Sequence, residues 1–212
     1  MVYLIPGLGA DERVFADLQL TMPTRVLAWL PPTPREQLPA YAARLAAAIP
    51  PQKPCWLVGV SFGGMVALEI GRLRPLARVV LVSSVAQPGQ LPGLVGLARA
   101  TGLHRLLPLW AAGLFPGLTG WLFGVKQLTH RRLLQQILRD TDPSFARWAV
   151  HQLVHWPGVA RVSSLRLHGS HDRLLPLSGP ADFVVEGGGH LMVLTHATAI
   201  RAILAQHLPD TC

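Results

Sequence analysis

Cysteine, lysine and acidic residues are scarce in this chain of 212 residues, which carries two cysteines, two lysines and eleven carboxylates. Cys55 lies in an apolar run and Cys212 ends the sequence, so they do not provide the disulfide framework of many small secreted proteins. Met1 leads directly into apolar sequence without a preceding basic region, unlike a secretory signal. We therefore expect a cytoplasmic protein.

Motifs for metals, dinucleotides and nucleic acids are also missing. No group of histidine, cysteine and acidic residues shows the spacing of a metal site, so no metal is expected. Gly7-Leu8-Gly9 lacks the third glycine of a dinucleotide-binding loop, so no cofactor is expected either. Basic residues do not alternate with aromatic ones, which argues against a nucleic-acid partner.

Negative charge is absent between Glu69 and Asp140, where nine basic residues lie, and the formal net charge of the chain is +8. A solvated surface rich in arginine is one explanation. Another is attraction of an anionic substrate, such as an acyl group on coenzyme A or on an acidic carrier protein. An anionic membrane surface is a third. The sequence leaves all three open.

An uncharged segment of twenty residues runs from Leu106 to Val125 and is long enough to cross a membrane. It contains two prolines and four glycines, and it lies between elements of a soluble sheet, so we expect no transmembrane span. Its aromatic side chains either pack on the core or also line an acyl pocket. The candidate pocket residues are Trp110, Phe115, Trp121 and Phe123.

Half of the residues are hydrophobic, which is enough for a sizeable core in one domain. Short apolar runs alternate with runs of helical spacing, a pattern typical of a parallel sheet covered by helices on both faces. The expected strands are 2–5, 25–29, 55–60, 78–83, 162–167 and 182–185. The expected helices include 35–49, 62–72 and 191–208.

The most informative motif is Gly-Val-Ser-Phe-Gly-Gly at residues 59–64, which follows the strand-like run 55–58 and precedes a helical stretch. Gly-x-Ser-x-Gly between a strand and a helix is typical of a nucleophile elbow. Gly59 and Gly63 flank a strained turn in which side chains would collide with the neighbouring strand and helix. The motif predicts that Ser61 is a nucleophile.

A serine nucleophile of this kind needs a carboxylate and an imidazole, which follow it along the chain in that order. The candidate carboxylates between Glu69 and the last residues of the chain are Asp140, Asp142, Asp172, Asp182 and Glu186. Asp172 follows the expected strand 162–167 through a short turn, and open α/β sheets gather their chemistry at the carboxyl ends of strands. We predict Asp172 as the acid.

Nine histidines compete for the role of the base. His190 ends the loop Gly187-Gly188-Gly189, directly after the expected strand 182–185, and such a loop can bring the imidazole over the serine. The other histidines lie on expected helices, in the central insertion, or too close to Asp172. We predict His190 as the base.

These elements together resemble the α/β-hydrolase superfamily, and the similarity covers nearly the whole chain. The matches are the elbow at 59–64, the acid turn at 168–176 and the histidine loop at 188–190; Ile-Pro-Gly-Leu-Gly at 5–9 occupies the position of the family's oxyanion loop, with Pro6 where many members have histidine. The resemblance implies that the backbone N–H groups of Leu8 and Phe62 form the oxyanion hole.

The resemblance also implies the α/β-hydrolase fold, with a mostly parallel sheet of about six strands and a helical lid insertion. We expect a core formed by residues 1–85 and 161–212, with the lid at 86–160. The implied activity is that of a serine hydrolase, which cleaves carboxylic esters or thioesters through an acyl-enzyme. An acyltransferase or lyase with the same triad, a membrane-associated lipase, and a non-catalytic binding member of the fold remain alternatives.

Overall fold

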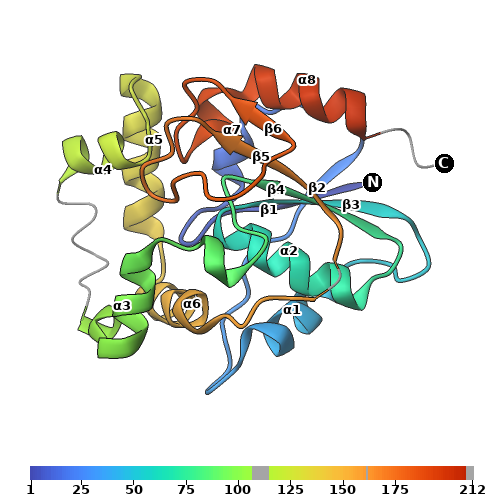
Figure 1. Cartoon of the computed structure of the whole chain (residues 1–212). Coiled ribbons are helices and arrows are strands. Elements are labelled where there is room, and N and C mark those ends of the chain that lie inside the picture. The colour runs from blue at the N-terminus through green and yellow to red at the C-terminus, as the bar shows by residue number, and fades with distance from the viewer. Residues whose placement is uncertain (107–114, 161, 209–212) are drawn as a thin grey trace.

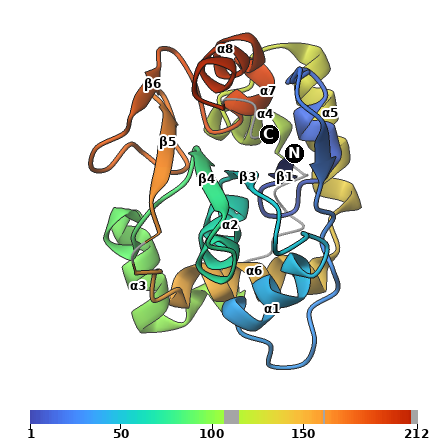
Figure 2. The same cartoon turned by 90° about the vertical axis from the view of Figure 1, so that its right-hand side faces the viewer.

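The core of the molecule is a parallel sheet of six strands in the order β2-β1-β3-β4-β5-β6 (Figures 1 and 2). The computed structural model describes residues 1–106, 115–160 and 162–208. The strands are β1 (Val2–Ile5), β2 (Thr24–Val26), β3 (Cys55–Val60), β4 (Ala77–Val82), β5 (Ser164–Gly169) and β6 (Phe183–Val185). The predicted fold class is confirmed.

The central strands are apolar because both of their faces are covered. Every residue of β1 and β3 is buried, and so are the last four residues of β4. One face is covered by α1 (Leu38–Ala46) and α2 (Phe62–Leu73), and the other by α7 (Met192–Thr195) and α8 (Ala197–His207), as Figure 2 shows. The loops that follow these strands therefore extend from a closely packed sheet.

The chain between β4 and β5 forms most of the remaining helices. They are α3 (Gly93–Thr101), α4 (Pro116–Leu122), α5 (Leu128–Asp140) and α6 (Pro143–His155), with short 3₁₀ helices at η2 (Pro88–Gln90) and η3 (Leu103–Leu106). Another 3₁₀ helix, η1 (Glu12–Phe15), lies between β1 and β2.

The helices of this insertion differ in how firmly they pack on the sheet. Phe145 and Ala149 of α6 join the core beside α1 and α2, whereas Leu134 and Ile137 of α5 join the core on the opposite face. No residue of α3 is buried. The insertion is thus anchored on both sides of the sheet, and the boundaries of a lid at 86–160 stay a prediction.

The expected strand 25–29 and helix 35–49 differ from the observed elements by three residues at an end, whereas the other expected strands and helix 62–72 differ by at most two, strand 162–167 being observed as Ser164–Gly169. The expected strand 25–29 ends at Val26, because Trp29 leaves the sheet and its indole N–H donates to the carbonyl oxygen of Ala10. The expected helix 35–49 begins only at Leu38, since Arg35 has a positive φ of 62°, outside the helical region.

The expected helix 191–208 is two helices. The chain turns at His196, where φ is −126° and ψ is 33°, between α7 and α8. Across the described residues, no helix combines the length and the apolarity that crossing a membrane requires.

Candidate active site

Ser61 lies at the sharp turn between β3 and α2, in a backbone conformation that L-residues rarely adopt, with φ 53° and ψ −123°. Two hydrogen bonds hold its carbonyl oxygen, one from the N–H of Gly64 at 2.9 Å and one from the hydroxyl of Ser84 at 2.6 Å. The Ser61 amide donates to the carbonyl oxygen of Val82 at 3.0 Å. The turn is therefore fixed from β4 as well as from α2.

Both flanking glycines are required by space. A Cβ atom on Gly59 would overlap the backbone of Gly63, and one on Gly63 would overlap the carbonyl oxygens of Ile5 and Pro6. The start of α2 thus packs directly against the end of β1 and the loop that follows it. This close approach brings that loop beside Ser61.

The structure brings Ser61, His190 and Asp172 together from three loops that follow β3, β5 and β6. His190 Nε2 lies 2.9 Å from Ser61 Oγ, and His190 Nδ1 lies 2.9 Å from Asp172 Oδ2. A carboxylate only accepts, so Nδ1 carries the proton and Nε2 presents its lone pair to the serine hydroxyl. The arrangement is a continuous relay from hydroxyl to carboxylate.

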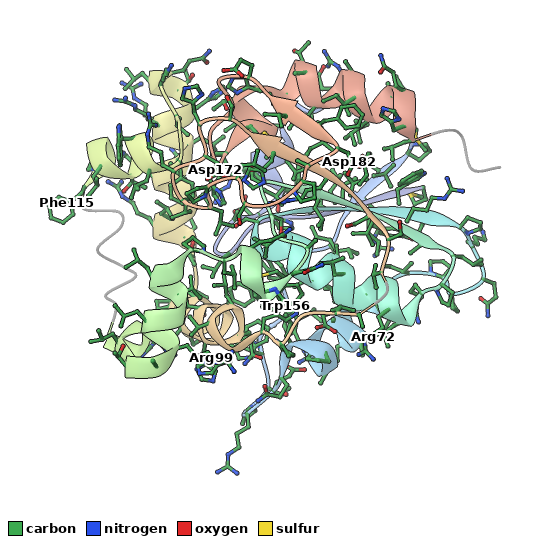
Figure 3. The ribbon with its side chains drawn as sticks, viewed as in Figure 1. Arg72, Arg99, Phe115, Trp156, Asp172 and Asp182 are labelled. Atoms are coloured by element: carbon green, nitrogen blue, oxygen red, sulfur yellow. The ribbon has the colours of Figure 1, made fainter. Side chains whose placement is uncertain are left out.

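Asp172 is held in place by its own turn. Its Oδ1 accepts hydrogen bonds from the backbone N–H groups of Leu174 at 3.0 Å and Leu175 at 2.8 Å. The Asp172 side chain is fully buried, near the end of the sheet in Figure 3, and His190 is 3% exposed. Burial strengthens the attraction between this carboxylate and a protonated imidazole, because water does not screen it.

The loop after β1 lies on the other side of Ser61. A Cβ atom on Gly7 would come 3.4 Å from the Cβ of Ser61. The indole N–H of Trp29 is shared between the carbonyl oxygens of Gly7 at 3.3 Å and Ala10 at 2.9 Å, which ties the two ends of the loop together. The hydroxyl of Thr141 donates to the carbonyl oxygen of Gly9 at 2.6 Å. Leu8 lies within this anchored loop.

The amide of Phe62 belongs to the first turn of α2, where N–H groups have no partner within the helix. An N–H group at this position can donate to a group outside the helix, and the positive end of the helix dipole strengthens such a bond to an anion. Leu8 directly follows Gly7 of the loop after β1, and Phe62 directly follows Ser61. Their role as an oxyanion hole stays a proposal.

A family model described as the alpha/beta hydrolase family matches residues 2–203. The chain belongs to the alpha/beta hydrolase family. No curated protein matches its sequence. The solved structures described next are each below 25% identical to this alpha/beta hydrolase, so they show its fold alone.

Three of these structures illustrate how varied such proteins are. A thermophilic esterase from Thermogutta terrifontis is 17% identical with a TM-score of 0.70, over 99% of this chain and 89% of that one. A hydrolase from Oleispira antarctica is 13% identical with a TM-score of 0.77, over 99% and 90%. A bromoperoxidase from Bacillus anthracis is 16% identical with a TM-score of 0.70, over 99% and 91%.

The four residues predicted to line a pocket in this alpha/beta hydrolase take different positions. The Phe123 ring meets the imidazole of His190 edge to face, with 5.6 Å between ring centroids. Trp121 is 55% exposed under the guanidinium of Arg173, and Phe115 is 61% exposed and projects away from the body of the molecule (Figure 3). Trp110 lies outside the described residues.

Two hollows among the described residues differ in their position relative to Ser61. One of about 240 Å³ lies beside the loop after β1 and is lined by Gly9, Trp29, Thr141 and Phe145, among others. A larger one of about 860 Å³ includes Trp56 and Ala77, at the amino ends of β3 and β4. The larger hollow lies at the edge of the sheet opposite Ser61, and the smaller one adjoins the loop after β1. Neither is lined by Ser61, Asp172 or His190, so neither is assigned to the relay.

The role of His168 was not predicted from the sequence, in which this residue was only a competing candidate for the base. This imidazole is completely buried behind Asp172, and its Nε2–H donates to the carbonyl oxygen of Leu175 at 2.8 Å. Its Nε2 lies 3.6 Å from Asp172 Oδ2. Burial lowers the pKa of His168 from its ordinary value of 6.5. It is thus a neutral residue that supports the acid turn.

Proposed function

We propose that the protein is a serine hydrolase that cleaves carboxylic esters or thioesters. The relay of Ser61, His190 and Asp172, with both contacts at 2.9 Å, is the observation that carries the proposal. Membership of the alpha/beta hydrolase family agrees with it. Esterases among the solved structures of the same fold make ester substrates a reasonable first choice.

In the first half of the reaction, Ser61 Oγ attacks the carbonyl carbon as His190 Nε2 takes the hydroxyl proton. Asp172 keeps the proton of Nδ1 in place and stabilises the imidazolium ion. The N–H groups of Leu8 and Phe62 donate to the oxyanion, and each such donor contributes about 3–4 kcal/mol to transition-state stabilisation. The imidazolium then protonates the leaving alcohol or thiol, which departs.

In the second half, His190 takes a proton from a water molecule and the hydroxide attacks the acyl-enzyme. Collapse of the second tetrahedral intermediate breaks the bond to Ser61 Oγ, and His190 returns the proton to the serine. The products are the free acid and the regenerated enzyme. An acyltransferase would use another hydroxyl or thiol in place of water at this step.

The surroundings of the relay favour an acyl substrate that carries negative charge. Arg173 directly follows Asp172 in the sequence and is exposed above Trp121. Lys126 is also exposed. It lies two residues after Gly124, which packs on Gly189 of the histidine loop. Exposed cations next to the mouth of a site attract anions. We therefore extend the proposal to anionic acyl carriers as partners.

The test is hydrolysis of chromogenic esters and thioesters of increasing acyl length. We expect turnover that Ser61→Ala lowers by at least about 10³-fold, since the triad acts as a unit. Ser163→Ala, at an exposed serine before β5, is the matched control and should keep full activity. Silence of the wild type on every substrate would contradict the proposal and favour a binding protein. Acyl transfer to an added alcohol in preference to water would favour the acyltransferase.

A further inference from the structure

Three histidines converge in the insertion, away from the relay. His104 lies on η3, whereas His151 and His155 lie one turn apart on α6. Each offers one ring nitrogen, and these three nitrogens all lie within 4.8 Å of one another. The ring centroids of His151 and His155 are 4.2 Å apart, and His104 lies 5.4 and 5.2 Å from them.

Backbone carbonyls fix the protonation of two of these rings. Nδ1 of His104 lies 3.0 Å from the carbonyl oxygen of Ala98, and Nδ1 of His155 lies 2.9 Å from that of His151. A carbonyl only accepts, so both Nδ1 atoms carry protons and both Nε2 atoms hold lone pairs. Ligating histidines in metalloproteins are oriented by the same kind of bond through their second nitrogen.

The spacing also suits a metal ion. His104 Nε2 lies 3.2 Å from His151 Nδ1. Two nitrogens bound to one tetrahedral metal at 2.0–2.1 Å are roughly 3.3 Å apart. In the metal-free protein this contact needs a proton, and Nδ1 of His151 supplies it to Nε2 of His104. Metal binding moves that proton to Nε2 of His151, so the ring changes tautomer without a change in charge.

The composition of the cluster selects the class of metal. Three imidazoles suit zinc, copper, nickel and cobalt ions, whereas magnesium and calcium prefer oxygen ligands. No carboxylate occurs in the sequence between Glu69 and Asp140 to supply such oxygens from this part of the insertion. His104 is 5% exposed, and His151 and His155 are half-buried, so an ion can enter beside α6.

We propose that His104, His151 and His155 bind a late divalent transition metal, such as Zn²⁺, with a fourth position open to water. The ion links η3 to α6, two elements whose ligands are 47 residues apart in sequence. Both α3 and η3 contact α6, but no residue of α3 is buried, so the packing of this segment is shallow. The metal thus fixes this part of the insertion.

The test uses tag-free protein, freed of metal with a chelator and then titrated with ZnCl₂ by calorimetry. We expect one equivalent to bind and, at a hundredfold excess over Kd, to raise Tm by roughly 5–10 °C. Zinc X-ray absorption should show nitrogen ligands at about 2.0–2.1 Å. Titration with CoCl₂ should give the visible bands of four- or five-coordinate Co²⁺.

Two single variants identify the ligands, with a third as control. His151→Gln and His155→Gln each remove one ligand and should weaken zinc binding by at least about 100-fold. His207→Gln replaces an exposed histidine of α8 and should bind as the wild type does. Circular dichroism of the metal-free variants checks that they fold.

Unchanged zinc affinity in folded His151→Gln and His155→Gln would overturn the proposal, as would a wild type that binds no zinc. Binding by the wild type of several weak equivalents, shared by all variants, would show adventitious surface binding and would overturn it too. None of these measurements uses ester hydrolysis, so the outcome is independent of the proposed catalytic function.

Discussion

At the scale of single residues, two of the four described non-glycine residues with positive φ lie where β3 and β4 end. Ser61 and Ser83 both have positive φ, of 53° and 48°. Such backbone conformations cost about 1–3 kcal/mol each, and they persist only where neighbouring groups determine them. Here the Ser84 hydroxyl bonds to the Ser61 carbonyl, and the Ser83 amide donates to Leu167. The strain directs the Ser61 hydroxyl toward His190.

Gly63→Ala tests how closely this turn is packed. The new methyl group would meet the carbonyl oxygens of Ile5 and Pro6, which cannot move without breaking the loop after β1. We expect urea unfolding to show a loss of at least about 3 kcal/mol. Gly96→Ala is the control, since nothing lies within 4 Å of that position in α3, and it should stabilise by about 0.5–1 kcal/mol. Equal effects of the two changes would contradict the packing argument.

His168 makes stability depend on pH. Its pKa is lowered by burial from 6.5, and its buried Nδ1 has no partner among the described residues. Below pH 6.5 the unfolded chain therefore binds a proton that the folded chain refuses, so stability falls as pH drops and is level above that value. His168→Gln should flatten this slope between pH 6.5 and 5, measured by urea unfolding at each pH. An unchanged slope would exclude His168 as its source.

At the scale of elements, Trp29 shows how a strand that ends early serves the site. Its indole N–H donates to Ala10 at 2.9 Å and to Gly7 at 3.3 Å, and its rings pack on Phe62 and Phe145. One side chain therefore contacts the loop that holds Leu8, the residue that begins α2, and the start of α6. The position of the loop after β1 therefore depends on the contacts of Trp29.

Trp29→Phe should lower kcat on a turned-over ester by roughly tenfold with little change in KM, because a displaced oxyanion donor loses part of the 10²–10³-fold that such donors contribute. Trp148→Phe is the matched control, since it removes an indole bond of similar length, 2.8 Å to the carbonyl of Glu36. We expect comparable losses of stability in the two variants but full kcat in the control. Equal kcat in both would show that Trp29 does not position the loop.

The elements that sequence alone located best are those with one dominant physical signal. β1 and β3 have the expected bounds because each is a short apolar run covered on both faces. Strand 25–29 was wrong at its end, since Trp29 is apolar but serves a loop. The continuous helix 191–208 was wrong because its helical spacing persists across His196, while the backbone turns there.

The relay was accessible from sequence because order and strand ends restrict it strongly. Residues that are neighbours in space but share no sequence pattern could not be predicted in this way. His151 and His155 are four residues apart on α6, but nothing in the sequence places His104 beside them. The pocket residues were chosen for apolarity alone, which does not distinguish Phe123, beside His190, from exposed Phe115.

At the scale of the whole molecule, its two lysines lie at opposite edges of the sheet. Lys53 is exposed in the turn before β3, at the amino ends of the strands, whereas Lys126 is exposed between α4 and α5. The charge of Lys126 reaches the far side of the histidine loop, where it helps to lower the pKa of His196, after the larger effect of burial. Neutralising either lysine changes the net charge by the same amount, but only Lys126 lies near the histidine loop. Comparing the two variants therefore distinguishes the effect of net charge from that of a charge near the site.

Charge neutralisation at these two lysines should affect an anionic substrate differently. Lys126→Gln should lower kcat/KM for an ester that carries a carboxylate by about two- to fivefold, the effect of about 0.5–1 kcal/mol from one exposed charge pair, with no change for an uncharged ester of equal length. Lys53→Gln removes the same net charge and should change neither. The difference should vanish as NaCl rises from 0.01 to 0.3 M, because the Debye length falls from about 30 Å to below 10 Å. Equal losses in both variants would mean that the net charge of +8 attracts the substrate, and that the position of Lys126 near the histidine loop does not matter.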